Sequence, residues 1–133
     1  MNAGKVLGIC YFGPAPRSFI QVDEVVSIVR SATGWDVDVD ELLTIGERSN
    51  NLTRVFNVRE GFRRADDTLP KRLFSPIEGE GALAGVAYPE DKFTQALTEL
   101  YRLKGWDQET GIPTRQRLEE LQIGWAADFI PGN

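Results

Sequence analysis

The segment from residue 90 to residue 104 carries the clearest structural pattern in the chain, that of an amphipathic α-helix. Pro89 precedes it, and Glu90 and Asp91 place negative charge where a helix favours it. Lys104 lies in the last turn, and Gly105 follows at a position where helices commonly end. The apolar side consists of Phe93, Ala96, Leu97, Leu100, Tyr101 and Leu103.

Two more helices are predicted before this one. The first covers 22–33, where four valines fall at the i, i+3, i+4 and i+7 positions of one stripe. Gly34 follows it at the place of a left-handed cap. The second begins near Asp38, because Asp38 and Glu41 have the spacing of a capping box, and its pattern extends to Phe62.

The remaining segments complete a prediction of an all-α fold. Thr114 caps a short fourth helix, and the run 5–12 is the one candidate strand. Residues 64–89 are rich in turn formers, and we expect a long irregular loop there. The tail from Trp125 to Asn133 is expected to be weakly ordered. Residues 1–133 thus form a single irregular domain of about four helices with a long ordered loop.

Composition excludes several kinds of chemistry. The 133 residues include one cysteine and no histidine, so a Ser-His-Asp triad, a Cys-His pair and a histidine metal site are all excluded. The net charge of −5 argues against a dedicated nucleic-acid binder. We find neither a signal peptide nor a run of apolar residues long enough to span a membrane. The expected location is the cytoplasm, with Cys10 reduced.

Arg59 is the first candidate binding residue. It falls in the middle of an apolar helix face, and Arg48 lies close to that face; the face comprises Ile45, Leu52, Val55, Phe56 and Phe62. A buried guanidinium needs a carboxylate or several carbonyls. One interpretation is an anion or interdomain site. The preferred one is a structural arginine paired with Asp66, Asp67 or a helical glutamate, because structural ion pairs are common.

Two further features have a structural and a functional interpretation. The glycines of 79–85 have GxGxxxG spacing without a preceding strand, so a flexible loop is favoured over a nucleotide site. Cys10 lies in an apolar run, which on pattern alone favours an inert buried thiol. The alternative is a single thiolate that completes a metal site built elsewhere, where Gly8 lets another backbone or a flat cofactor approach. No pair of carboxylates has a catalytic spacing, and no catalytic residue is predicted.

Three blocks of sequence carry a resemblance to a known protein family. They agree in order and spacing across about residues 5–123, nearly the whole chain. The blocks include Glu47-Arg48, Asn51-Leu52, Arg54, Phe56-Asn57 and Arg59-Glu60-Gly61-Phe62; then Asp66-Asp67-Thr68-Leu69-Pro70-Lys71-Arg72; then Tyr101, Lys104-Gly105-Trp106-Asp107, Gly111-Ile112-Pro113-Thr114 and Leu118-Glu119-Glu120-Leu121. These blocks resemble the C-terminal end of the tungsten-containing aldehyde:ferredoxin oxidoreductases, and the resemblance implies an all-helical C-terminal domain of a larger oxidoreductase.

The resemblance also implies a role for Cys10. The family has a D-x-x-G-[LI]-C motif whose cysteine is the fourth ligand of a [4Fe-4S] cluster, and three other cysteines come from an upstream segment. Gly8, Ile9 and Cys10 match this motif. Lys5 stands where the family has an aspartate that contacts the pterin cofactor. The implied cofactor contacts are therefore Lys5, Gly8, Ile9 and Cys10, with Cys10 as the metal ligand.

The function implied by the resemblance is part of an enzyme that oxidises an aldehyde to a carboxylic acid. A tungsten or molybdenum bis-pterin centre would carry the chemistry, and the [4Fe-4S] cluster would pass electrons to ferredoxin. The implied partners are upstream domains or a subunit, and ferredoxin; no nucleic acid or membrane is implied. The isolated chain is expected to hold no cofactor, to be inactive and to self-associate through exposed apolar surface. The alternatives are a free-standing helical interaction module that has lost the cofactor, and an anion-binding domain using Arg48, Arg59 and Arg63.

Overall fold

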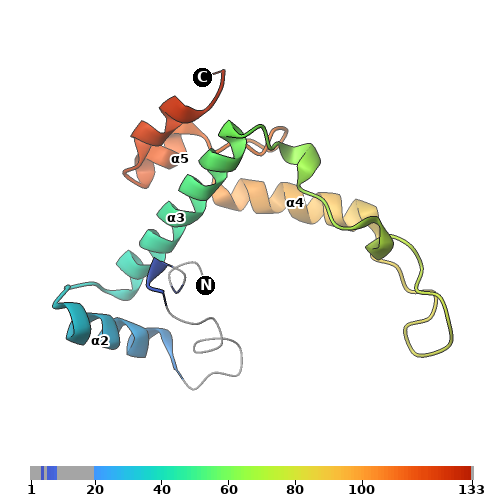
Figure 1. Ribbon diagram of the computed structural model, residues 1–133, viewed down its shortest axis with the longest axis horizontal. Coiled ribbons are helices and arrows are strands. Elements are labelled where there is room, and N and C mark those ends of the chain that lie inside the picture. Colours follow the sequence, from blue (N-terminus) through green and yellow to red (C-terminus); the bar gives the residue numbers. More distant parts are fainter. Residues whose placement is uncertain (1–3, 5, 9–19, 133) are drawn as a thin grey trace.

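The computed structural model describes residues 4, 6–8 and 20–132 of the chain, and it is drawn in Figure 1. The described residues contain helices and no strands, which confirms the all-α prediction. The helices are α2 (Val22–Thr33), α3 (Val39–Arg59), η1 (Arg64–Asp66), η2 (Lys71–Leu73), α4 (Glu90–Lys104), α5 (Arg115–Glu120) and η3 (Gly124–Phe129). Helix α3 runs through the centre, and the other elements branch from it (Figure 1).

The predicted ends of α2 and the predicted start of α3 are confirmed. Gly34 has a φ of 71° and donates its backbone N–H to Arg30, so it is the left-handed cap of α2. The Asp38 side chain accepts a hydrogen bond of 2.8 Å from the backbone N–H of Glu41 at the start of α3. Helix α3 ends at Arg59, three residues before the predicted Phe62, and Gly61 there has a φ of 99°.

The predictions for the third and fourth helices are also confirmed. Helix α4 covers 90–104, and Gly105 terminates it with a φ of 70°. Thr114 accepts a hydrogen bond from the Arg117 backbone and begins α5. The candidate strand at 5–12 is not found among the described residues of that run, where Val6 is helical and Leu7 and Gly8 form a turn. The rest of that run lies outside the described residues.

Two separate apolar clusters hold the helices together. The N-terminal cluster joins α2 to the start of α3, and it comprises Val25, Val26, Val29, Val37 and Leu42. The C-terminal cluster joins the second half of α3 to α5 and η3, and it comprises Val55, Val58, Leu118, Leu121, Ile123, Ala126, Ala127 and Ile130. Helix α3 contributes to both clusters and so connects them.

The expectation of a weakly ordered tail was wrong. Residues 124–129 form η3, whose Ala126 and Ala127 are 1% and 0% exposed in the C-terminal cluster. Ile130 is 5% exposed and packs into the same cluster. The two alanines let the backbone of η3 approach α3 and α5 closely, and this apolar packing offsets the entropy cost of ordering the tail.

Residues 68–100 form an arm that projects away from the two clusters. The arm consists of the loop after η1, η2, a further loop and most of α4, and it extends to the right in Figure 1. No residue from 59 to 100 is buried, although α4 has the apolar side that the sequence predicted. Only Tyr101, at the last turn of α4, enters the interior of the protein. No helix of the described chain has the length and apolar character that a membrane crossing requires.

Candidate functional site

Of the four residues expected to contact cofactors, the structure describes one. Gly8 lies in an exposed turn with a φ of 69°, and a Cβ built there would meet nothing within 4 Å. A left-handed turn with open space above it is a place where another group can approach the backbone. Lys5, Ile9 and Cys10 lie outside the described residues.

The prediction that Arg59 is at least partly buried on an apolar face was wrong. Its side chain is 46% exposed and pairs with Glu60 at 2.8 Å, while its guanidinium lies over the ring of Phe56. Phe56 and Phe62, which helped to define that face in the sequence, are 53% and 54% exposed. The buried side of α3 is rotated away from them and includes Asn51, Arg54 and Val58.

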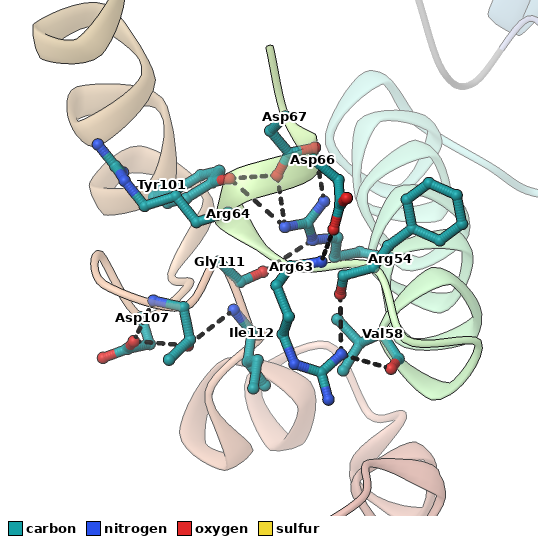
Figure 2. Close-up of polar contacts among 12 residues, drawn as sticks. Arg54, Val58, Arg63, Arg64, Asp66, Asp67, Tyr101, Asp107, Gly111 and Ile112 are labelled. Carbon is teal, nitrogen blue, oxygen red and sulfur yellow. Dashed lines mark hydrogen bonds and ion pairs between the residues drawn. The ribbon is translucent and has the colours of Figure 1, made fainter.

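Arg54 is the buried arginine of α3, with 6% of its side chain exposed. Its Nη1 and Nη2 donate to the two carboxylate oxygens of Asp67 at 2.9 and 2.6 Å. Its Nε donates to the carbonyl oxygen of Gly111 at 2.7 Å (Figure 2). This bidentate pairing satisfies the guanidinium that burial would otherwise penalise. A structural arginine with Asp67 as partner was the preferred interpretation, but the sequence assigned it to the wrong arginine.

Tyr101 joins the same network from α4. It is 1% exposed, and its hydroxyl donates to the Asp67 carboxylate. The Arg54 guanidinium lies 5.6 Å from the Tyr101 ring centroid and 4.9 Å from that of Trp106, within cation–π range. Asp67, Arg54 and Tyr101 therefore connect η1, α3 and α4 at one point. We call these three residues with Gly111 the clamp.

Arg64 gives the clamp a second layer. Its backbone N–H donates to Thr110, and its Nη1 donates to the carbonyl of Gln108 at 2.9 Å. Its Nη2 donates to the hydroxyl of Thr98 at 2.8 Å. Figure 2 shows Arg64 beside Tyr101, close to the clamp. Both ends of the arm are thus fixed to the turn at 107–112.

Asn51 and Trp106 add a buried polar contact beside the clamp. Asn51 is 0% exposed, its amide donates to the carbonyl of Glu47, and its carbonyl oxygen accepts from Trp106 Nε1 at 2.8 Å. Both polar atoms of the buried amide are therefore satisfied. The contact ties α3 to the residues after α4.

The clamp sets the ionisation of its members. Burial alone would raise the pKa of Asp67, but hydrogen bonds from Arg54 and Tyr101 and the charges of Arg54 and Arg64 outweigh it, so this pKa is lowered. Burial and the neighbouring Asp67 carboxylate raise the pKa of Tyr101 to about 12. Asp67 is therefore ionised and Tyr101 neutral across the physiological pH range. Neither group is poised for proton transfer near neutral pH.

A cleft of about 410 Å³ opens beside the clamp, between α3, the η1 region and α4. One wall is polar and comes from α3; it includes Asn50, Thr53 and Asn57. The facing wall is mostly apolar and comes from α4; it includes Phe93, Leu97 and Leu100. The cleft holds neither a nucleophile paired with a base nor, among the described residues, a group of His, Cys, Asp and Glu side chains that could hold a metal.

Arg48, Arg59 and Arg63, considered above as an anion site, each have partners of their own. Arg48 donates to the carbonyl of Leu121 at 2.8 Å, and it pairs with Glu41. Arg63 donates to the carbonyl of Val58 at 2.6 Å, near the end of α3. The structure therefore does not bring the three guanidinium groups into a common site.

The protein is a helical domain whose arm is anchored by the clamp but not buried. Exposed apolar surface of this kind is typical of a domain that contacts further parts of a larger protein. Comparison with known proteins agrees. A family model described as aldehyde ferredoxin oxidoreductase, domains 2 and 3, matches residues 1–123. The chain belongs to this family.

Relatives and solved structures support the assignment. The tungsten-containing aldehyde ferredoxin oxidoreductase of Pyrococcus furiosus is 36% identical over 118 residues, which cover 87% of this chain and 18% of the relative. The corresponding protein of Thermococcus kodakarensis is 34% identical over 125 residues, which cover 92% and 19%. The active site complex BamBC of benzoyl coenzyme A reductase, solved with 1,5-dienoyl-CoA, has a TM-score of 0.77 and 25% identity. That match covers 96% of this chain and 18% of the other. The chain thus spans about a fifth of the length of the relatives it matches.

Proposed function

We propose that this chain is the helical cofactor-covering part of a tungsten- or molybdenum-pterin aldehyde:ferredoxin oxidoreductase, in which Cys10 is a ligand of a [4Fe-4S] cluster. The observation that carries the proposal is the family match over residues 1–123, which includes Gly8, Ile9 and Cys10 in the order the ligand motif requires. The remaining parts of the enzyme are other domains or a separate subunit, and ferredoxin is the electron acceptor.

The residues near Cys10 fit such a role. A cysteine thiolate is the ordinary protein ligand of an iron–sulfur cluster. Gly8, two residues earlier, is exposed and has open space where a side chain would stand, so its backbone can lie close to a bound group. When bound, the pterin-held metal would supply oxidation of the aldehyde to the acid, with water as the oxygen source, and the cluster would supply one-electron transfer.

In this proposal the clamp has a structural role and takes no part in the reaction. The clamp keeps an ionised Asp67 and a neutral Tyr101 bound to each other, so neither exchanges protons readily at neutral pH. In this proposal the aldehyde chemistry depends on the bound metal centre and not on the clamp. We therefore expect the isolated chain to show no aldehyde oxidation.

The test uses the complete oxidoreductase that contains this chain, purified with its partner domains or subunit. Iron and tungsten or molybdenum are quantified, the cluster is followed by electron paramagnetic resonance, and aldehyde oxidation is assayed with a viologen dye. Cys10→Ala is expected to alter or abolish the cluster signal and the dye reduction. The control is Ser31→Ala, a change at an exposed residue of α2. A Cys10→Ala enzyme with full iron content and an unchanged spectrum would contradict the proposal.

A second candidate function is a helical interaction module that has lost the cofactor. The observation that favours it is Lys5, which stands where the family motif has an aspartate. Purification of the protein from its source in complex with a partner, but without iron, tungsten or molybdenum, would establish this alternative.

A further inference from the structure

The arm, residues 68–100, exposes far more apolar surface than it needs in order to fold. Its exposed large apolar residues are Leu73 (44%), Ile77 (49%), Leu83 (62%), Val86 (50%), Tyr88 (47%) and Leu100 (45%). Burying such side chains is favourable, so an arm that remained in water would forgo this stabilisation at several positions. Contiguous exposed apolar surface of this kind marks a place of contact with another protein surface.

Backbone hydrogen bonds gather five of these residues at the end of the arm. Ile77 donates its N–H to Val86 at 3.0 Å, and Tyr88 donates its N–H to Leu73 at 2.9 Å. Gly85 donates its N–H to Ile77 at 2.9 Å and closes the loop that carries Leu83. We call Leu73, Ile77, Leu83, Val86 and Tyr88 the tip surface. It is a looped ribbon closed by these backbone hydrogen bonds.

The clamp fixes the direction in which the tip surface is presented. Asp67, directly before the arm, is bound by Arg54 from α3 and by Tyr101 at the last turn of α4. Arg64 adds hydrogen bonds to Gln108 and Thr98, so both ends of the arm are fixed. A surface held from both ends loses less conformational entropy on docking than a free loop does.

Charge and length decide what covers the tip surface. Glu78 and Glu80 are the charged residues of the loop 73–89, and Lys71 and Arg72 directly precede Leu73 at its base, so a complementary surface is apolar with basic residues where it meets the two glutamates. A second copy of this chain is a poorer complement, because its arm carries more acidic residues than basic ones. About four-fifths of the length of the relatives lies outside this chain and provides the other candidate surface.

We propose that the tip surface docks on the remaining polypeptide of the oxidoreductase, against an apolar patch with a basic rim. This inference rests on the proposed function for the identity of the partner. The anchored arm then provides the contact between this helical domain and the rest of the enzyme.

The test places a photo-crosslinking side chain on the tip. Leu83 is replaced by p-benzoylphenylalanine in the complete purified oxidoreductase, and Asp128, whose side chain is 73% exposed on η3, is replaced in the same way as the control. We expect the probe at 83 to crosslink to the remaining polypeptide with roughly tenfold higher yield than the probe at 128, because a buried probe has protein atoms on every side. Mass spectrometry identifies the crosslinked peptides.

Every outcome of this experiment is decisive. Crosslinked peptides from the remaining polypeptide of the oxidoreductase support the proposal. Peptides from a second copy of this chain, peptides from an unrelated protein, or a yield equal to that of the control each overturn it. The iron content of the Leu83 variant separates the two proposals: a normal cluster without the crosslink rejects only the docking surface. The crosslink without a cluster rejects only the cofactor role.

Discussion

The Arg54 guanidinium donates hydrogen bonds to both carboxylate oxygens of Asp67, and this bidentate contact links α3 to the residue before the arm. The two side chains differ in exposure, at 6% for Arg54 and 30% for Asp67. The Arg54 side chain is almost completely shielded from water, whereas the Asp67 carboxylate is partly solvated. The contact is therefore most costly to break from the aspartate side, because that leaves a buried positive charge without its counter-ion.

Replacing Asp67 is predicted to destabilise the fold strongly. Asp67→Ala leaves the buried Arg54 guanidinium with the Gly111 carbonyl as its remaining close acceptor. We expect the free energy of unfolding to fall by about 3 kcal/mol, at the lower end for a broken buried pair because Asp67 is partly exposed. Urea unfolding of the purified chain, followed by circular dichroism, measures the change.

The matched control is an ion pair on the surface of α4. Glu99 pairs with Arg102 at 2.7 Å, but both side chains are more than half exposed. Glu99→Ala is expected to leave the free energy of unfolding nearly unchanged, because water screens an exposed ion pair. Equal effects of Asp67→Ala and Glu99→Ala would show that the clamp is no more than a surface pair.

Acid should weaken the fold through Asp67. Hydrogen bonds from Arg54 and Tyr101 outweigh burial and lower the pKa of Asp67 below its ordinary value of 3.8. The unfolded chain therefore binds the proton more readily, and the contribution of Asp67 is complete above about pH 5 and is lost as the pH falls below 3.8. We expect Asp67→Asn to lose less stability than the parent between about pH 5 and pH 2, as measured by urea unfolding. An equal loss of stability in Asp67→Asn and in the parent over this pH range would contradict the prediction.

Alkaline pH should weaken the same clamp through Tyr101. Burial and the Asp67 carboxylate raise the pKa of Tyr101 to about 12, above the ordinary value of 10.0. The folded state holds the phenolic proton more tightly, so this contribution is complete below pH 10 and is lost as the pH rises through about 12. A tyrosinate absorbance titration should show a component near pH 12 that is absent from Tyr101→Phe. Persistence of that component in the variant would assign it to another residue.

Local sequence signals predicted the helices because the determinants of those helices are themselves local. The bounds of α2 and α4 follow from valine or leucine spacing and from Gly34 and Gly105, which both adopt the left-handed conformation their positions required. The tail was predicted wrongly because its order comes from packing on α5, which directly precedes it, and on α3, which is far away in the sequence. Two alanines pack there without giving a strong apolar pattern.

The clamp could not be located from helix periodicity alone. The apolar face predicted from helical periodicity included Phe56 and Phe62, which are exposed in the structure. The predicted buried side of α3 was therefore rotated toward Arg59. The true side places Asn51, Arg54 and Val58 inward, where polar residues at helical spacing meet partners from distant segments. A search for polar residues that repeat at helical spacing beside a turn with adjacent aspartates would have favoured Arg54. The predicted cofactor contacts other than Gly8 lie outside the described residues, so Cys10 stays a prediction.

Gly111 offers the most sensitive test of the packing around the clamp. It has a φ of 73°, and a Cβ built there would lie 2.9 Å from the Tyr101 hydroxyl oxygen and against the Arg54 guanidinium. Gly34 has nearly the same φ of 71° but no atom within 4 Å of its Cβ position, so it is a matched control for backbone strain. Gly34→Ala should lower the free energy of unfolding by about 1 kcal/mol from the left-handed backbone alone. Gly111→Ala should cost about 3 kcal/mol, because overcrowding of Arg54 and Tyr101 adds to the same strain. If urea unfolding gave the same loss for both variants, the carbonyl of Gly111 and the two side chains would not be held as closely as the clamp requires.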